Sequence, residues 1–105
     1  MPLPPPQDQH IPLAAAAGLT RAYRQGAGPT AIKASMFFRQ YLEEMLAQPG
    51  VAGVRVYFGQ NVAGAATLVM VGVDQNGNDV TEGTILNNHV PCPPFCDVAG
   101  SALNG

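Results

Sequence analysis

Hydrophobic and polar positions follow a helical period in the first half of the chain and a strand period in the second. Residues 12–25 are rich in alanine and place Leu19 and Tyr23 on one side, which predicts a helix that packs closely against its support. Gly26 and Pro29 end this helix, because glycine suits a helix C-terminus and proline cannot continue the hydrogen-bonding pattern.

A second, longer helix is predicted from Ala31 to Gln48, with Thr30 as its N-cap and Pro49-Gly50 as its end. At 100° per residue its wide apolar face, the best core candidate in the chain, consists of Ala34, Phe37, Phe38, Tyr41, Leu42, Met45 and Leu46. Ile32 and Met36 fall among the polar residues, one helical turn apart. A monomer has no need to expose them, so they predict a contact with another chain.

Three strands follow the helices. Residues 51–58 alternate, with Val54, Val56 and Phe58 on one face and Arg55 and Tyr57 on the other. Residues 65–73 are apolar on both faces. The Asn76-Gly77 dipeptide predicts a hairpin with a type I′ turn, and the returning strand is expected from about residue 78 to 86, with Gly83 as an interruption.

The predicted order is therefore ααβββ, which indicates an α+β fold with two N-terminal helices packed on a short three-stranded antiparallel meander and with flexible proline-rich ends. We expect residues 1–10 to form a proline-rich arm, residues 11–87 the α+β domain and residues 88–105 a tail rich in cysteine and proline.

Self-association is the main functional inference from this pattern. A strand that is apolar on both faces is covered on both faces, yet the two helices can cover only one. The simplest cover for the other face is a second copy of the chain, in a homo-oligomer or a filament. The residues expected at interfaces are Ile32, Met36, Leu68, Met70, Arg55 and Tyr57. The predicted function is thus a small structural or binding module that acts through protein–protein interfaces.

Composition narrows the other function classes. Only 11% of the 105 residues are charged, and the formal net charge is -2, so the chain lacks the basic surplus of a nucleic-acid-binding protein. No apolar run approaches the roughly 18 residues of a membrane span. No Lys or Arg precedes the first apolar stretch, so a secretory signal is not expected and a cytoplasmic location is. Catalysis is the weakest hypothesis, because the adjacent Glu43 and Glu44 point about 100° apart on a helix and form no acid pair.

The segment from His89 to Cys96 holds both cysteines and leaves three interpretations open. His89, Cys92 and Cys96 could bind zinc, although a zinc site normally brings a fourth ligand. The two thiols could instead form a disulfide if the chain turns at Pro94-Phe95. They could also stay reduced beside Phe95, as expected in a cytoplasmic protein. Apart from zinc, no cofactor is predicted. The first two options give the alternative function, a small metal-binding or thiol-redox protein.

The N-terminal arm contains a P-x-x-P sequence, Pro2-Leu3-Pro4-Pro5. Such a sequence favours a stiff extended arm, and it is also typical of polyproline II ligands that dock into grooves lined by aromatic side chains.

Four strings carry a resemblance to known sequences. They are Ala31-Ile32-Lys33-Ala34, the segment from Gln48 to Gly59, the segment from Leu68 to Asp74, and Cys92-Pro93-Pro94-Phe95-Cys96. Together they resemble a family of small uncharacterised bacterial proteins with a C-terminal CPPxC motif, over a stretch from about Ile11 to Cys96. The resemblance implies a bacterial source. It implies no activity, ligand or catalytic residue.

Overall fold

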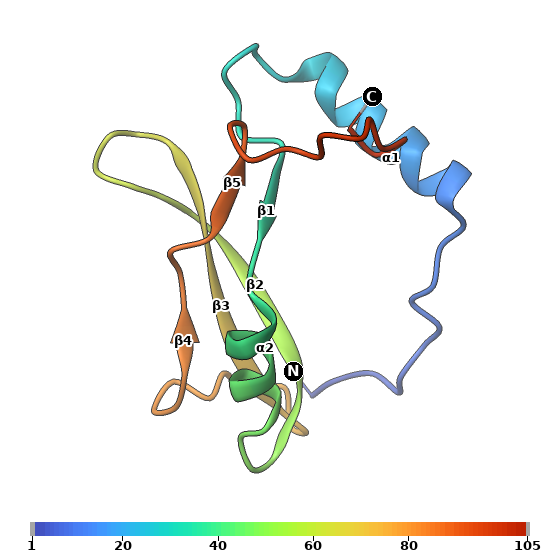
Figure 1. The fold of residues 1–105 in the computed structure, drawn as a ribbon. Coiled ribbons are helices and arrows are strands. Elements are labelled where there is room, and N and C mark those ends of the chain that lie inside the picture. Colours follow the sequence, from blue (N-terminus) through green and yellow to red (C-terminus); the bar gives the residue numbers. More distant parts are fainter. Residues whose placement is uncertain (1, 105) are drawn as a thin grey trace. The chain divides into compact units, whose positions relative to one another are not determined.

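The structure is a computed structural model that describes residues 2–104. It is an α+β fold with two helices and antiparallel strands (Figure 1). The elements are α1 (Leu13–Gly26), β1 (Ala34–Met36), α2 (Arg39–Leu46), β2 (Val51–Gln60), β3 (Ala66–Asp74), β4 (Ile85–Leu86) and β5 (Val90–Cys92). Neither helix in this part of the chain combines the length and the apolar character needed to cross a membrane.

The chain forms two compact units. Met36–Val90, together with the first residues up to Pro5, makes a unit that we call the sheet unit. Pro6–Ser35 and the described residues from Pro91 onward make the other, the helix–tail unit.

The sheet unit is built on a three-stranded antiparallel sheet with the order β2-β3-β4. Val56 lies opposite Met70, and Phe58 lies opposite Leu68, so these side chains share one face of the sheet. The side chains of Arg55 and its neighbours at every second position share the other face. The predicted division of the first two strands into faces is confirmed. A separate two-stranded sheet pairs β1 with β5, so the prediction of one single meander is wrong.

The core of the sheet unit lies between α2 and β3. Met45 of α2 is 0% exposed, and Met70, Val71 and Val73 of β3 are buried. Gly72 permits this approach, because a Cβ there would lie 3.0 Å from Val51 Cγ2 and 3.4 Å from Met45 Sδ. The absence of a side chain at this position thus lets the helix pack close to the strand.

The predicted helix from Ala31 to Gln48 is wrong in its first eight residues. Ala34–Met36 is a strand that pairs with β5, and the Lys33 amide donates a hydrogen bond of 2.7 Å to the Cys92 carbonyl. Pairing with a distant segment therefore outweighs the local helix propensity of these residues. The helix begins only at Arg39, after Phe38 as the N-cap residue. As a result, Ile32 and Met36 do not lie one turn apart on a helix.

The returning strand is also shorter than predicted. The turn at Asn76-Gly77 is present, but only Gly77 has a positive φ, of 85°, so the turn is not type I′. After the Val73–Asp79 bridge the chain leaves the sheet and rejoins it at Ile85. The side chain of Gln48 explains the gap, because its Oε1 accepts a hydrogen bond of 2.7 Å from the Thr84 amide. Gly83 leaves room for it, since a Cβ there would lie 2.0 Å from Gln48 Oε1.

In the helix–tail unit, α1 forms as predicted, one residue displaced at each end. Ala17 is the buried residue of α1, whereas Leu19 and Tyr23 are exposed. The tail after Cys96 is held by hydrogen bonds. Asp97 Oδ1 accepts hydrogen bonds from the amides of Ala99 and Ser101, and the Arg24 Nη1 donates one of 2.6 Å to the Leu103 carbonyl.

Candidate functional site

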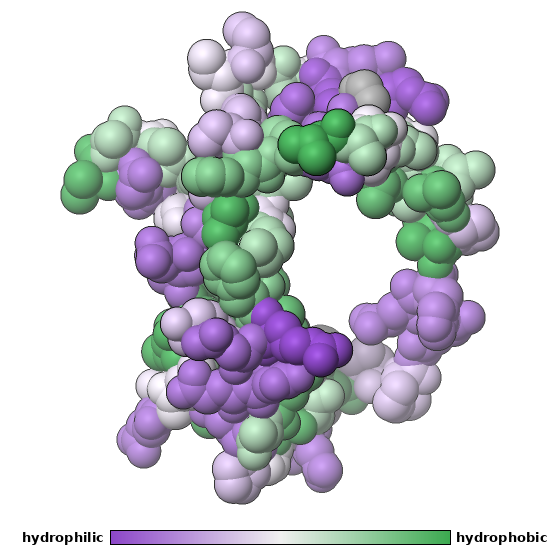
Figure 2. All heavy atoms as spheres, viewed as in Figure 1, coloured by the Kyte–Doolittle hydropathy of each residue, from purple (hydrophilic) through white to green (hydrophobic). Residues whose placement is uncertain are grey.

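The exposed side chains of β2 form the most extensive apolar surface on a strand of the sheet unit. β2 is an edge strand, because it pairs with β3 on one side and is the first strand of its sheet. Val54, Val56 and Phe58 project from the same face of β2 and are exposed, and Phe58 is 91% exposed. We call these three side chains the β2 apolar row. At the tip of the β2–β3 hairpin, hydrophobic residues including Val62 are exposed as well (Figure 2).

The predicted interface residues Leu68 and Met70 lie beside this row on β3. Leu68 is half-buried and faces Phe58 across the strands. Met70 is 7% exposed, because it belongs to the core of its own chain. A partner chain can therefore contact Leu68 and the β2 apolar row. Met70, which lies opposite Val56, is buried and is not accessible to a partner.

The other predicted pair on β2, Arg55 and Tyr57, contacts Asp79 on the opposite face of the sheet. Arg55 Nη1 lies 2.5 Å from Asp79 Oδ1, and the Tyr57 hydroxyl donates a hydrogen bond to Asp79 Oδ2. The pKa of the Asp79 carboxyl lies below its usual range. The hydrogen bond from Tyr57 is the larger cause, and the hydrogen bond from Arg55 is the smaller one. The Asp79 carboxylate raises the pKa of the Tyr57 hydroxyl in turn. The charge of Arg55 is thus balanced within the chain.

Asp79, the partner of this pair, was not among the residues singled out from the sequence. Asp79 pairs with Val73 across the strands, and Asp74 instead accepts hydrogen bonds at its Oδ1 from the amides of Asn76 and Asn78. The signal in the sequence was the presence of Arg55 and Tyr57 on one strand face, which calls for an acidic partner across the sheet.

A cavity of about 550 Å³ lies in the sheet unit where α2 begins and β4 ends. We call it the aromatic groove, and its lining consists of Met36, Phe37, Phe38, Gln40, Tyr41, Ile85, Leu86, Asn87 and Asn88. The lining includes Met36, one of the predicted interface residues. Phe38 and Tyr41, predicted as core residues, are exposed, and Phe38 precedes the helix as its N-cap residue. The lining contains no charged side chain.

Ile32, the remaining interface candidate, belongs to the helix–tail unit. Its side chain is half-buried, and its carbonyl accepts a hydrogen bond of 3.3 Å from the Tyr23 hydroxyl. Because Ala34–Met36 is a strand, Ile32 and Met36 do not share a common helix, and the reason for grouping them is lost.

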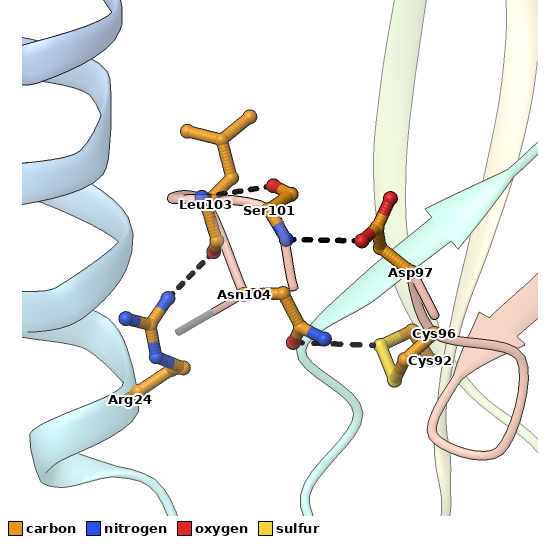
Figure 3. The surroundings of a disulfide bond; sticks show 7 residues. All are labelled: Arg24, Cys92, Cys96, Asp97, Ser101, Leu103 and Asn104. Carbon is orange, nitrogen blue, oxygen red and sulfur yellow. Dashed lines mark hydrogen bonds between the residues drawn. A yellow bond between two sulfur atoms is a disulfide. The ribbon is translucent and has the colours of Figure 1, made fainter. Parts of the chain in front are cut away.

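The two cysteines form a disulfide, Cys92–Cys96 (Figure 3). Cys92 is buried and Cys96 is half-buried. Figure 3 shows Asn104, at the end of the tail, beside the sulfur of Cys92, with Asn104 Oδ1 3.9 Å from Cys92 Sγ. Because a disulfide sulfur carries no hydrogen, this is a packing contact. The bond closes the turn that connects β5 to the tail.

His89 is not part of this disulfide. It belongs to the sheet unit, where its ring lies against that of Phe37 with the ring centroids 6.4 Å apart. Zinc binding by His89, Cys92 and Cys96 needs both thiolates, so it would require the disulfide to be reduced first. It stays a prediction.

In comparisons with known proteins, no protein-family model, no curated protein and no solved structure matches the chain. The resemblance to a bacterial family with a CPPxC motif therefore stays a prediction, and functional argument rests on the chain's own chemistry.

Proposed function

We propose that the chain is a small self-associating binding module and that the outer edge of β2 carries the contact between copies. The observation behind the proposal is a ten-residue edge strand that exposes the β2 apolar row. An edge strand presents unpaired backbone N–H and C=O groups, which are a template for another strand.

Two devices that normally protect such an edge, proline and lysine residues, are missing from β2, although its pairing with β3 is irregular between Val51 and Gly53. Its sequence, VAGVRVYFGQ, contains no proline and no lysine. Its single charged residue, Arg55, is neutralised by Asp79 and so offers little repulsion to a second copy. These features favour pairing of the β2 edge with a strand of another chain.

Antiparallel pairing of β2 with β2 of a second copy agrees best with these features. The contact would be isologous, with the same surface on both partners, and would continue the sheet across the interface. It would bring together the apolar rows of both copies. Complete burial of an exposed side chain the size of Phe58 stabilises a contact by about 1.5–3 kcal/mol.

A lysine placed in the middle of the row tests the proposal. Val56→Lys puts two like charges near each other in a β2–β2 contact, and Val56 is exposed enough in the single chain to accept the longer side chain. We expect the wild-type chain to sediment as an oligomer and Val56→Lys to sediment as a monomer. Val62→Lys, at the exposed hairpin tip, is the matched control and should keep the wild-type mass.

Two results would refute the proposal: a monomeric wild-type chain at concentrations up to the millimolar range, or equal masses for Val56→Lys and the wild type. Met70→Glu is unsuitable as a test, because it would place a charge in the core and unfold the sheet unit.

The disulfide favours thiol–redox chemistry as a second candidate function. Cys96 is the more exposed cysteine, so a thiolate of a dithiol reductant would attack its sulfur and release Cys92 as a thiolate. The second thiol of the reductant then displaces Cys96, which leaves two protein thiols and an oxidised reductant. Equilibration with glutathione buffers, read as a gain of two hydrogens by mass spectrometry, measures the potential. A potential near that of the cellular glutathione pool supports this role, and one below about −300 mV indicates a structural bond.

The disulfide also bears on the location of the protein. Disulfides persist in oxidising compartments and are rare in the cytosol. The bond therefore argues against the cytoplasmic location that the N-terminal sequence favours. Trapping of free thiols by alkylation in intact cells decides between them: alkylated cysteines indicate the cytoplasm, and protected ones an oxidising compartment.

A further inference from the structure

We propose that the aromatic groove binds the proline-rich segment of residues 2–6 from a second copy of the chain. The inference deepens the proposed self-association and rests on it, but it concerns a different surface from the β2 edge.

The lining of the groove has the composition that recognises a polyproline II segment. Such a segment docks its rings against aromatic side chains, and its backbone carbonyls stay free to accept hydrogen bonds. Phe38 and Tyr41 supply exposed rings at the groove. The side-chain amides of Gln40 and Asn88 and the hydroxyl of Tyr41 can donate hydrogen bonds. None of these three groups is hydrogen-bonded to another described residue, so all three are available to a ligand.

Charge points to the same kind of ligand. The lining of the groove is uncharged, although Arg39 and Glu43 lie on the same helix. The side chains of residues 2–6, Pro-Leu-Pro-Pro-Pro, are uncharged too. An acidic or basic peptide would lose hydration in the groove and find no counter-charge. An apolar segment with free carbonyls avoids this cost.

The chain's own arm leaves the groove free. Residues 2–6 are exposed, and none of them lines the groove. A preformed extended segment loses little conformational entropy on binding, and here both the segment and its site are exposed on every copy. A second copy is therefore the occupant that the chain itself supplies.

This contact would differ in symmetry from the β2 pairing. Binding of the arm of one copy in the aromatic groove of another is a heterologous contact, because the two partners use different surfaces. Repeated contacts of this kind close into a ring or continue into a filament. Together, the two contacts would link β2-paired dimers into larger assemblies.

A synthetic peptide with the sequence of residues 2–10 tests the site directly. Titrated into the full-length chain, it should shift the backbone amide signals of Asn87 and Asn88 and compete with any arm already bound. Phe38→Ala should weaken the peptide about tenfold or more, because truncation of a central aromatic contact costs over 1 kcal/mol. Leu46→Ala is the matched control: Leu46 is on the same helix and is 59% exposed, against 56% for Phe38, but lies outside the groove. It should leave the affinity unchanged.

Sedimentation of the variants separates this proposal from the β2 contact. One variant carries Pro4→Ala and Pro5→Ala in its arm and keeps an intact groove, and the Phe38→Ala variant keeps an intact arm. A mixture of the two should form one arm-in-groove contact that neither variant forms alone. No shift on addition of the peptide, or equal weakening by Phe38→Ala and Leu46→Ala, overturns the groove proposal and leaves the β2 contact standing. The peptide could also bind to a wild-type chain that is monomeric at all concentrations. That result would show that a second copy does not occupy the groove, and it would refute the proposed self-association as well.

Discussion

The sheet unit and the helix–tail unit are stabilised in different ways. The sheet unit has an apolar core, in which Met45, Met70, Val71 and Val73 are buried. In the described part of the helix–tail unit, the buried hydrophobic residues are only Ala17 and Cys92. The Cys92–Cys96 disulfide and the Asp97 hydrogen bonds link residues within the tail. The hydrogen bonds from Arg24 to the Leu103 carbonyl and from the Lys33 amide to the Cys92 carbonyl join the tail to the other segment of the unit.

The difference follows from the residues available to each unit. The sheet unit combines a helix bearing large apolar side chains with a strand that is apolar on both faces. The helix–tail unit pairs an alanine-rich helix with a tail of small residues, which bury little area. Small units with little apolar burial commonly depend on a covalent link. We therefore expect the two units to respond to different substitutions.

Truncation of Met45 should have the largest effect. Met45→Ala leaves a cavity between α2 and β3 and should destabilise the sheet unit by about 3 kcal/mol. Hydrogen exchange of the β3 amides, compared with that of α1, measures the loss unit by unit. The exposed neighbour Leu46→Ala is the control and should change stability by about 0.5 kcal/mol or less. Equal loss of protection in α1 and β3 would mean that one core serves both units and would end the comparison.

Loss of the disulfide should have a smaller effect and should act on the helix–tail unit. The bond closes a loop of only about five residues, for which loop-closure entropy gives a contribution of about 2 kcal/mol. Cys92→Ala with Cys96→Ala should therefore speed hydrogen exchange at the Ser101 and Leu103 amides by up to about thirtyfold. These amides donate to Asp97 and Ser101 within the tail.

Chemical reduction of the wild-type chain should reproduce the effect of the double variant. The Val71 amide in β3 is the internal reference and should keep its exchange rate. If Val71 loses protection as strongly as Ser101, the disulfide supports the sheet as well, and the distinction between the units fails.

The sequence predicted best what depends on local pattern. The helix of α1, the strands β2 and β3 and their two faces follow from residue spacing, and the structure confirms them. The predictions failed where distant segments decide. Residues 34–36 form a strand because Val90–Cys92 offers them a partner, and the returning strand is interrupted because Gln48 reaches Thr84. Neither partner can be identified from local periodicity.

The candidate surfaces show the same division. Arg55 and Tyr57 were predicted to share a face, but their partner Asp79 depends on where the turn returns the chain. The aromatic groove was missed, because Phe38 and Tyr41 fit the core pattern of a longer helix. In the structure both rings are exposed, and Phe38 lies outside the helix, which starts at Arg39. The exposure of the β2 apolar row could be predicted only by knowing which strand lies at the edge of the sheet.

The smallest expected effect is a pH dependence confined to the sheet unit. Asp79 has a lowered pKa because Tyr57 and Arg55 bind its charged form. A carboxyl whose folded pKa lies below its unfolded value of about 4 stabilises the fold above that value, and this contribution is lost as the pH falls through the folded pKa. The pKa of Tyr57 is raised, so its contribution is present below about pH 10 and is lost as the pH rises through the folded value.

Unfolding of the sheet unit in denaturant, measured from pH 2 to 6 and from pH 9 to 12, separates the two contributions. Wild-type stability should fall at both ends, by less than in the substitutions above because water screens these partly exposed groups. Asp79→Asn should flatten the acidic side, since it removes the titrating carboxyl. Tyr57→Phe should remove the alkaline loss and reduce the acidic one, because Arg55 remains to bind the carboxylate. If Asp79→Asn keeps the full acidic slope, the cluster does not stabilise the sheet, and apolar burial alone distinguishes the sheet unit from the helix–tail unit.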